Sequence, residues 1–284
     1  MSTTSPSPVS LADGGGLPFK LVATDLDGTL LNSAEGVSVR TRAALADATA
    51  AGALHIIVTG RGAAWARPVF DEIGYRGIAV CGQGAQVYDA GAHRLLTSIT
   101  LDRKVAALAI ERIEEETGPL AIAASQDGLD GDVLAGPGYE LQIASHLPVV
   151  RAERDGLLAA PVSKLYIQHP ELSDDALAEA ARRAAGDLVG VVMAGAGIVE
   201  LLPLGLSKAT GLAVAAHRLG VKAADTIAFG DMPNDVPMFG WARHGVAMAN
   251  AHQELLSVAD EVTLSNDEDG VAAVLERLYP AGLV

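Results

Sequence analysis

Short apolar runs alternate with amphipathic stretches near both ends of the chain, and each apolar run stops at polar residues. Such runs predict buried strands, and the amphipathic stretches between them predict helices. In the first part of the chain the expected strands are 20–24, 53–58 and 77–81, with helices at 39–51 and 63–73. In the last part we expect a helix from 207, strands at 225–229, 242–248 and 259–263, a short helix around 237, and a final helix at 269–279. This alternation is typical of a Rossmann-like, doubly wound parallel sheet with helices on both faces.

Between these two parts the pattern changes to paired strands with charged helices. One hairpin is predicted at 87–96 around Ala90-Gly91, and another at 189–202 around Gly195 and Gly197. Further strands are expected at 119–124 and 163–168, with helices at 102–117 and 173–186. Mixed strands and helices with hairpins predict a separate α+β domain. We therefore expect an α/β core of residues 19–83 and 196–284, interrupted by an inserted α+β cap domain at 84–195.

Composition narrows the classes of protein that the chain can belong to. Half of its 284 residues are hydrophobic, which suffices for one large domain or two ordinary ones. The formal net charge of −15 argues against nucleic acid and anionic membrane surfaces as partners, and no apolar run is long enough to span a membrane. The single cysteine, Cys81, excludes an internal disulfide and fits a reducing, cytoplasmic location. Residues 1–18, rich in Ser, Pro and Gly, lack the features of a signal peptide and are expected to form a disordered tail.

The most informative motif is Asp25-Leu26-Asp27-Gly28-Thr29, at the end of the first predicted strand. Ligands of open α/β sheets gather at the carboxyl ends of strands, and this motif puts two acids there. Two carboxylates this close repel each other unless a cation lies between them, which favours a hard metal such as Mg²⁺. The alternative is an ordinary turn, since Asp and Gly favour turns. A calcium loop does not fit, because the closing glutamate is missing at the required spacing.

Three later segments also place polar residues beside predicted strands or helices. In Thr59-Gly60-Arg61 a hydroxyl and backbone amides could hold a phosphate oxygen, or Thr59 could simply cap the next helix. Lys208 lies in the first turn of a helix, where it opposes the helix dipole and serves either a ligand or the solvent. The segment 230–235 supplies Asp231 and Asp235 at the end of another strand, unless it too is only a turn.

Together these segments suggest phosphoryl transfer. Asp25 is the candidate nucleophile that forms an aspartyl phosphate, and Asp27 is the candidate general acid and base. Mg²⁺ would be bound by Asp25, Asp231 and the backbone carbonyl of Asp27, with Asp235 supporting the metal site from behind. Thr59 and Lys208 would hold the remaining phosphoryl oxygens. The full set of candidate phosphate- or substrate-binding residues is Gly28, Thr59, Gly60, Arg61, Lys208 and Asn234.

The four motifs, in this order, resemble those of the haloacid dehalogenase superfamily of phosphohydrolases. The interval from Asp27 to Thr59 is short, whereas the long interval from Thr59 to Lys208 holds the extra domain. This placement resembles the C2 cap of the Cof-type, class IIB, phosphatases. The resemblance implies a Mg²⁺-dependent phosphatase of small phosphorylated metabolites, such as sugar phosphates or phosphorylated cofactors and their precursors. Further segments that fit the group are 82–85, 200–203 and 265–271.

The chain departs from the family pattern at three positions, and other functions could use the same kinds of residue. Gln83 and Met232 stand where the group often has asparagine, and position 233 is proline, which affects loop geometry rather than the core acids. A phosphomutase would use the same aspartyl phosphate. A signalling receiver also groups aspartates, a threonine and a lysine around Mg²⁺, but receivers are about half this length and lack a cap. A non-catalytic phosphate-binding module is the third alternative.

Overall fold

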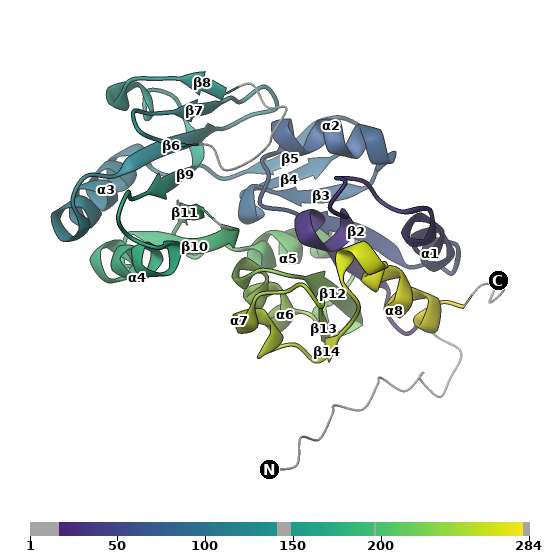
Figure 1. The fold of residues 1–284 in the computed structure, drawn as a ribbon. Helices are drawn as coiled ribbons and strands as arrows, with labels where there is room; N and C mark the ends of the chain where they lie inside the picture. Colours follow the sequence, from purple (N-terminus) through teal and green to yellow (C-terminus); the bar gives the residue numbers. More distant parts are fainter. Residues whose placement is uncertain (1–16, 141–148, 196, 281–284) are drawn as a thin grey trace, which may run out of the picture. The chain divides into compact units, whose positions relative to one another are not determined.

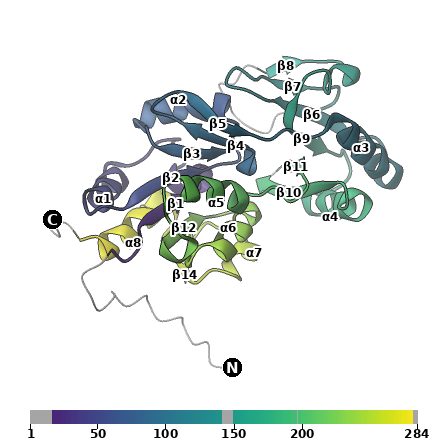
Figure 2. The ribbon, with the colours of Figure 1, turned by 180° about the vertical axis from the view of Figure 1, so that it is seen from behind.

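The computed structural model describes residues 17–140, 149–195 and 197–280, and these form two compact units (Figures 1 and 2). The described residues within Met1–Val58, Gly77–Ala79 and Leu212–Val284 form the first unit. Those within Thr59–Arg76 and Val80–Gly211 form the second unit. Of the predicted tail at 1–18, the first sixteen residues lie outside the described part of the chain.

The first unit is built on a parallel sheet. Its strand order is β14-β13-β12-β1-β2, and each neighbouring pair is parallel. Two elements cross between the units, namely β3 (Ile78–Cys81) and α5 (Lys208–Arg218). The other helices and strands of this unit are β1 (Leu21–Thr24), α1 (Val39–Ala50), β2 (Leu54–Val58), β12 (Thr226–Gly230), α6 (Val236–Trp241), β13 (His244–Ala247), α7 (Gln253–Leu256), β14 (Glu261–Val262) and α8 (Gly270–Leu278).

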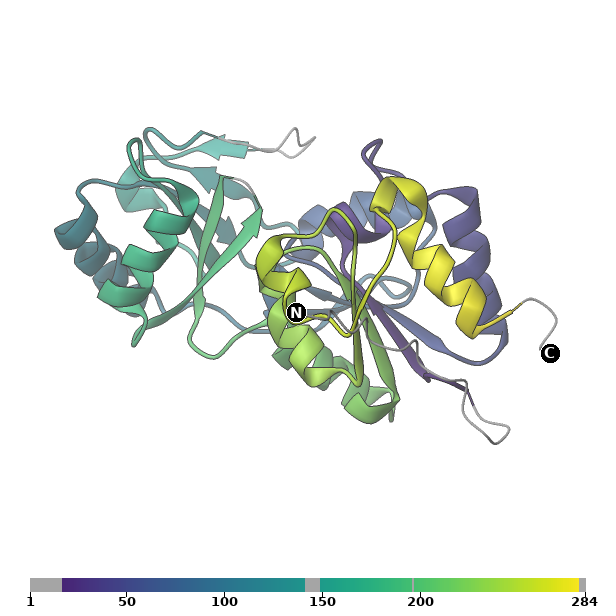
Figure 3. The ribbon, with the colours of Figure 1, turned by 60° about the horizontal axis from the view of Figure 1, so that its bottom comes forward.

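Helices cover both faces of this parallel sheet. On one face α1 and α8 lie side by side (Figure 3), and their apolar residues share a core with Val22, Phe229 and Val246. On the other face α6 approaches β13 closely, because a Cβ at Gly245 would lie 2.6 Å from the Phe239 ring. Strand β1 is buried along its whole length, as expected for a strand covered on both sides. These findings confirm the predicted doubly wound α/β core.

Strands β1 and β12 mark the point where the chain reverses its direction of travel across the sheet. From β1 the chain moves to β2 on one side, whereas β12, β13 and β14 follow each other on the opposite side. The two strands are paired in register, with Thr24 opposite Phe229. In open α/β sheets the crevice at such a reversal is where ligands bind.

The second unit contains a six-stranded sheet with the order β10-β11-β9-β6-β7-β8. All pairs are antiparallel except β7 with β8. A further antiparallel pair, β4 with β5, ends the eight-stranded order β14-β13-β12-β1-β2-β3-β4-β5 and confirms the turn predicted around Ala90-Gly91. The elements of this unit are α2 (Ala63–Ile73), β4 (Gln86–Asp89), β5 (Arg94–Ser98), α3 (Arg103–Thr117), β6 (Ala121–Gln126), β7 (Val133–Ala135), β8 (Val149–Arg151), β9 (Val162–Gln168), α4 (Asp174–Ala185), β10 (Val189–Gly195) and β11 (Ile198–Pro203).

The two faces of the six-stranded sheet differ in chemistry. Side chains alternate along a strand, so neighbouring residues point to opposite faces. One face carries Leu165 and Leu201, which join the apolar core under α3 and α4. These two helices lie side by side in Figures 1 and 2. The other face carries Lys164 and Glu200, together with Tyr166, all of them buried. We call this face the polar face of the second sheet.

Some short elements were missed by sequence patterning. Strands β7 and β8 have only three residues each, and α7 has only four, so they are too short to show a period. The strand predicted at 259–263 is reduced to Glu261–Val262. Cys81 is fully buried as expected, and burial raises the pKa of its thiol. Within the described ranges no helix combines the length and the apolar character needed to cross a membrane.

Candidate active site

Three buried acids gather at the carboxyl ends of β1 and β12. Asp25 directly follows β1, Asp231 directly follows β12, and Asp235 lies one turn later in the chain. Each offers a carboxylate oxygen, and the three oxygens lie within 4.8 Å of one another. The exposed fractions are 5% for Asp25, 7% for Asp231 and 0% for Asp235. The pairing of β1 with β12 therefore brings together acids that are more than 200 residues apart in the sequence.

Hydrogen bonds orient these carboxylates. Asp235 Oδ2 accepts from the backbone N–H groups of Asp231 (3.0 Å) and Met232 (3.1 Å). The Thr29 hydroxyl donates to Asp231 Oδ1 at 2.8 Å, and the Leu26 N–H donates to Asp25 Oδ1 at 2.7 Å. The carboxylates of Asp25 and Asp235 are thus held by the turns that follow their own strands, and that of Asp231 by Thr29 in the turn after β1. No long, flexible side chain takes part in these hydrogen bonds.

The residues of this cluster suit a hard metal ion. Two unit charges 4 Å apart interact by about 4 kcal/mol at an effective dielectric constant of 20, so three buried carboxylates repel each other strongly without a cation. Carboxylate oxygens are the ligands that Mg²⁺ and other hard divalent cations prefer. The donor set and its burial therefore fit a metal site, and the cluster is able to bind such an ion.

The turn after β1 separates the two acids of the first motif. Asp25 is buried, whereas the Asp27 side chain is exposed and is not part of the three-acid cluster. Gly28 has a φ of +68°, and a Cβ there would lie 2.3 Å from Asp231 Oδ2. The Gly28 carbonyl accepts a hydrogen bond from the Asn250 side-chain amide at 2.8 Å. The chain therefore turns sharply at Gly28 to leave room for Asp231.

The candidate phosphate loop, Thr59-Gly60-Arg61, belongs to the second unit. Thr59 is fully buried, and its Oγ1 accepts a hydrogen bond from the Arg61 N–H at 3.1 Å. The guanidinium carbon of Arg61 lies 5.6 Å from the centroid of the Trp65 ring. The loop carbonyls of Thr59 and Arg61 accept hydrogen bonds from the N–H groups of Gln83 (3.2 Å) and Gly82 (2.7 Å). The segment 82–84 thus supports the loop from one side.

Lys208 is the first residue of α5, and only 1% of its surface is exposed. This burial rules out the solvated lysine that the sequence left open. Close backbone packing fixes the start of the helix, because a Cβ at Gly84 would lie 2.1 Å from the Ser207 carbonyl oxygen. Asn234 is also buried, at 7% exposed, beside Asp235 in the chain.

Several polar residues around the loop were not singled out as site residues from the sequence. Gln86 Oε1 accepts a hydrogen bond from the Ala63 N–H, the first amide of α2, at 2.8 Å. Lys164 and Glu200 form a buried ion pair on the polar face of the second sheet. The signal in the sequence was a single charged residue inside each of two apolar strands, at 162–167 and 198–202. Buried charges of this kind are rare unless they are paired.

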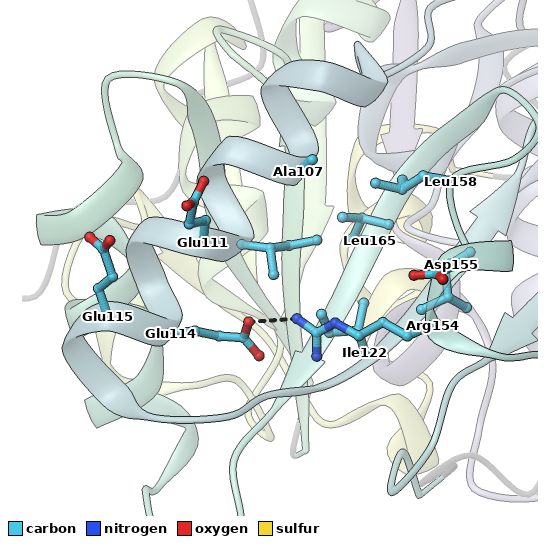
Figure 4. A pocket seen from close by; sticks show the side chains of 11 residues that line it. Ala107, Glu111, Glu114, Glu115, Ile122, Arg154, Asp155, Leu158 and Leu165 are labelled. Carbon is cyan, nitrogen blue, oxygen red and sulfur yellow. Dashed lines mark hydrogen bonds and ion pairs between the residues drawn. The ribbon is translucent and has the colours of Figure 1, made fainter.

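Two of the pockets in the described part of the chain border the second sheet in places that bear on the loop and on α3. One of about 250 Å³ opens at the start of α2, where Gly62, Trp65, Gln86 and Ser125 contribute to its lining. The other, of about 670 Å³, lies between α3 and the segment around Arg154 (Figure 4). Its floor includes Ile122 and Leu165, and Arg154 pairs with Glu114 across it at 2.5 Å. Because Leu165 lines this second pocket, the adjacent Lys164 points to the opposite face of the sheet.

Comparisons with known proteins place the chain in a family. A family model described as haloacid dehalogenase-like hydrolase matches residues 22–275. The chain belongs to the haloacid dehalogenase-like hydrolases. This hydrolase is 32% identical over 287 residues to Phosphatase YwpJ of Bacillus subtilis (strain 168), covering 92% of this chain and 100% of that protein.

Two further proteins are similar to the hydrolase over nearly their whole length. It is 28% identical over 283 residues to the 5-amino-6-(5-phospho-D-ribitylamino)uracil phosphatase YwtE of the same organism, covering 92% of this chain and 98% of that protein. The structure of the HAD subclass IIB sugar phosphatase BT4131 has a TM-score of 0.77 at 19% identity, covering 91% of this chain and 98% of that chain, and it shares the fold. The resemblance to Cof-type phosphatases is confirmed, and the hydrolase is a phosphatase of the haloacid dehalogenase type.

Proposed function

We propose that this hydrolase is a Mg²⁺-dependent phosphatase that releases phosphate from small phosphorylated metabolites through an aspartyl-phosphate intermediate. The observation that carries the proposal is the buried cluster of Asp25, Asp231 and Asp235 at the carboxyl ends of two adjacent parallel strands. Phosphate monoesters hydrolyse extremely slowly without a catalyst, so a site for them needs a positioned nucleophile and concentrated positive charge. When bound, Mg²⁺ supplies that charge and lessens the repulsion between carboxylate and phosphate.

In the first step the Asp25 carboxylate attacks phosphorus, and the bond from phosphorus to the leaving-group oxygen breaks. Asp27 donates a proton to that oxygen, so the alcohol departs neutral. In the second step Asp27 accepts a proton from water, the water oxygen attacks phosphorus, and the bond from Asp25 to phosphorus breaks. The exposed position of Asp27 suits a group that must exchange protons with substrate and water, whereas the burial of Asp25 suits a fixed nucleophile.

The remaining residues have binding roles in this proposal. Asp25 and Asp231, with the backbone carbonyl of Asp27, would hold Mg²⁺, and Asp235 would orient Asp231 through the hydrogen bond to its N–H. The Thr59 hydroxyl and the Lys208 ammonium would bind the phosphoryl oxygens. Gly28, Gly60, Arg61 and Asn234 are proposed as further contacts to the phosphate or the substrate.

We also propose that residues 84–195 act as the cap that selects the substrate. Support comes from the apolar core under α3 and α4, which residues of this range form together with Val199 and Leu201 of β11. The similarity to a uracil-derivative phosphatase and to a sugar phosphatase supports small phosphorylated metabolites as the substrate class.

The first test measures phosphate release from a panel of phosphorylated metabolites and p-nitrophenyl phosphate, with Mg²⁺ and with EDTA. Asp25→Asn should lower turnover about 10⁴-fold or more, because removal of a catalytic nucleophile leaves little residual rate. Asp155→Asn is the matched control, since this exposed aspartate lines the pocket of Figure 4 and touches none of the proposed machinery. EDTA should abolish turnover in the wild type and in the control.

Two outcomes would contradict the proposal. Turnover that survives Asp25→Asn would rule out the aspartyl phosphate on this residue, and turnover that survives EDTA would rule out the metal requirement. The same assay separates a phosphatase from a phosphomutase, because a phosphatase releases inorganic phosphate whereas a phosphomutase returns an isomeric phosphate ester.

A further inference from the structure

Lys164 is a fully buried charge in the middle of β9. Its exposed fraction is 1%, and that of its partner Glu200 on β11 is 2%. Burial of an ion pair costs several kcal/mol per ion in desolvation, and such a pair often stabilises a protein no better than apolar side chains would. The pair therefore calls for an explanation beyond stability, and its contacts provide one.

The Lys164 ammonium connects the polar face of the second sheet to the candidate phosphate loop. Its Nζ donates to the Gly60 carbonyl oxygen at 2.7 Å and also to Glu200 Oε1. The second oxygen of Glu200, Oε2, accepts from the Gln83 side-chain amide at 2.7 Å. The Lys164 Nζ lies 4.7 Å from the centroid of the Tyr166 ring, which closes one side of the ammonium. All of these residues belong to the second unit.

These contacts complete the support of three successive carbonyls. The carbonyls of Thr59 and Arg61 are held by backbone N–H groups of residues 83 and 82, whereas the carbonyl between them, that of Gly60, is held by Lys164. A Cβ at Gly60 would lie 2.7 Å from Gln83 Nε2, so the side-chain amide of Gln83 packs directly on this backbone. A side chain at position 60 would therefore push the Gln83 amide out of this place.

The Gly60 carbonyl matters because the peptide group is planar. The carbonyl of Gly60 and the N–H of Arg61 belong to one peptide and rotate together. That N–H donates to Thr59 Oγ1 at 3.1 Å, so the hydroxyl must direct its own hydrogen elsewhere. Lys164 thereby fixes the orientation of the peptide that in turn orients the Thr59 hydroxyl.

We propose that Lys164 and Glu200 are positioning residues for phosphate binding: Lys164, held in place by Glu200, fixes the peptide between Gly60 and Arg61 and so aims the Thr59 hydroxyl at a phosphoryl oxygen. This inference rests on the proposed function, in which Thr59 binds phosphate. Neither Lys164 nor Glu200 touches the substrate in this proposal, and their effect is transmitted through the loop backbone.

The test uses the double variant Lys164→Met/Glu200→Gln. A single substitution would leave one buried charge without its partner and would destabilise the protein, whereas the double variant removes both charges together. The amide oxygen that Glu200→Gln introduces can still accept a hydrogen bond from Gln83, but the Gly60 carbonyl loses its donor. The matched control is Arg183→Met/Glu116→Gln, which removes an ion pair of 2.6 Å between α4 and α3, on exposed positions of the same unit.

We expect the double variant to fold and to show a kcat/KM that is about ten- to a hundredfold lower, since small misplacements of binding groups are costly. The inhibition constant for inorganic phosphate should rise by about tenfold, and the Arg61 amide should exchange its hydrogen faster. The control variant should match the wild type in all three measurements.

Hydrogen exchange separates this inference from the proposed function. If the folded double variant keeps the wild-type exchange rate at Arg61, the positioning role is overturned whatever the activity. If exchange is faster but the inhibition constant for phosphate is unchanged, the loop has become more mobile without any effect on phosphate binding. The proposal is then also overturned. If the wild type hydrolyses no phosphate ester, the proposed function fails, whereas faster exchange in the variant still supports the hold of Lys164 on the loop.

Discussion

Two separate features of the structure require glycine at position 28. The backbone adopts a φ of +68°, which side-chain-bearing residues rarely populate, and the space where a Cβ would stand is taken by the Asp231 carboxylate. The first requirement concerns the local backbone, and the second concerns Asp231, which follows another strand, β12. A substitution at this position therefore tests the acid cluster without replacing any of its acids.

Gly28→Ala should weaken Mg²⁺ binding by about tenfold or more and lower turnover by up to about a hundredfold, because the Asp231 carboxylate must move. The measurement is a Mg²⁺ titration of activity and of the melting temperature. Gly74→Ala is the matched control, since Gly74 has a similar φ of +75° but open space around its Cβ position. It should cost about 1 kcal/mol of stability and leave the Mg²⁺ response unchanged; an equal loss of Mg²⁺ response in both variants would refute the clash with Asp231.

The sequence identified the residues of this cluster because Asp25 and Asp231 follow apolar runs at strand ends, and Asp235 lies four residues after Asp231. Asp25, Asp231 and Asp235 could be assigned to one edge of a sheet by that pattern alone. Lys164 and Glu200 could not be assigned to the loop, because nothing in a single strand tells which backbone carbonyl its charged residue will reach. The roles of the predicted site residues in catalysis stay predictions until the variants are measured.

At the scale of elements, the second sheet depends on strict alternation along its strands. Leu165 lies in the apolar core under α3 and α4, whereas Lys164 beside it reaches the candidate phosphate loop. The same strand therefore carries both the stability of this unit and the proposed positioning of the loop.

Leu165→Ala should destabilise the second unit by about 2–5 kcal/mol, because it opens a cavity at a fully buried position. Leu108→Ala on α3 is the control, since Leu108 is 41% exposed and its truncation should cost about 0.5 kcal/mol or less. The chain has two tryptophans, so urea unfolding in a Trp241→Phe background reports on Trp65 in the second unit. Equal midpoints for the two variants would contradict the assignment of Leu165 to the core.

Periodicity predicted the longer elements well, and it failed where an element is shorter than its own period. The helices α1 to α4 and the hairpins β4–β5 and β10–β11 lie close to their predicted positions. Strands β7 and β8 form because they pair with an existing sheet edge, and this tertiary requirement leaves almost no trace in three residues.

At the scale of the whole molecule, stability should depend on pH through His55. This half-buried residue of β2 shares a hydrogen bond of 2.9 Å between its Nε2 and the Thr24 hydroxyl oxygen, and burial lowers the pKa of its ring to about 4. The unfolded chain takes up a proton near pH 6.5, whereas the folded protein does so only near pH 4. Protonation therefore favours the unfolded state, and stability present above pH 6.5 is lost as the pH falls towards 4.

The pH dependence can be measured by urea unfolding of the wild type and His55→Gln between pH 7 and pH 4.5. A pKa shift of this size corresponds to about 3 kcal/mol of unfolding free energy for a fully buried ring. Because the His55 ring is partly exposed, we expect the wild type to lose only about 1–2 kcal/mol more unfolding free energy than His55→Gln over this pH range. The exposed His217, replaced by glutamine, serves as the control. Parallel pH curves for the wild type and His55→Gln would show that His55 does not carry this dependence.

The ion pair between Lys164 and Glu200 also limits how this protein can exchange parts with its relatives. In a chimera with residues 84–195 taken from a relative, the relative would supply the residue at the position of Lys164. Gly60, Gln83 and Glu200 would still come from this protein. A graft without a basic residue there would leave a buried glutamate uncompensated and a loop carbonyl without its donor. Recombination across these boundaries should therefore succeed only when graft and host together supply both residues of the ion pair. The proposed cap is then less independent of the rest of the chain than its continuous range in the sequence suggests.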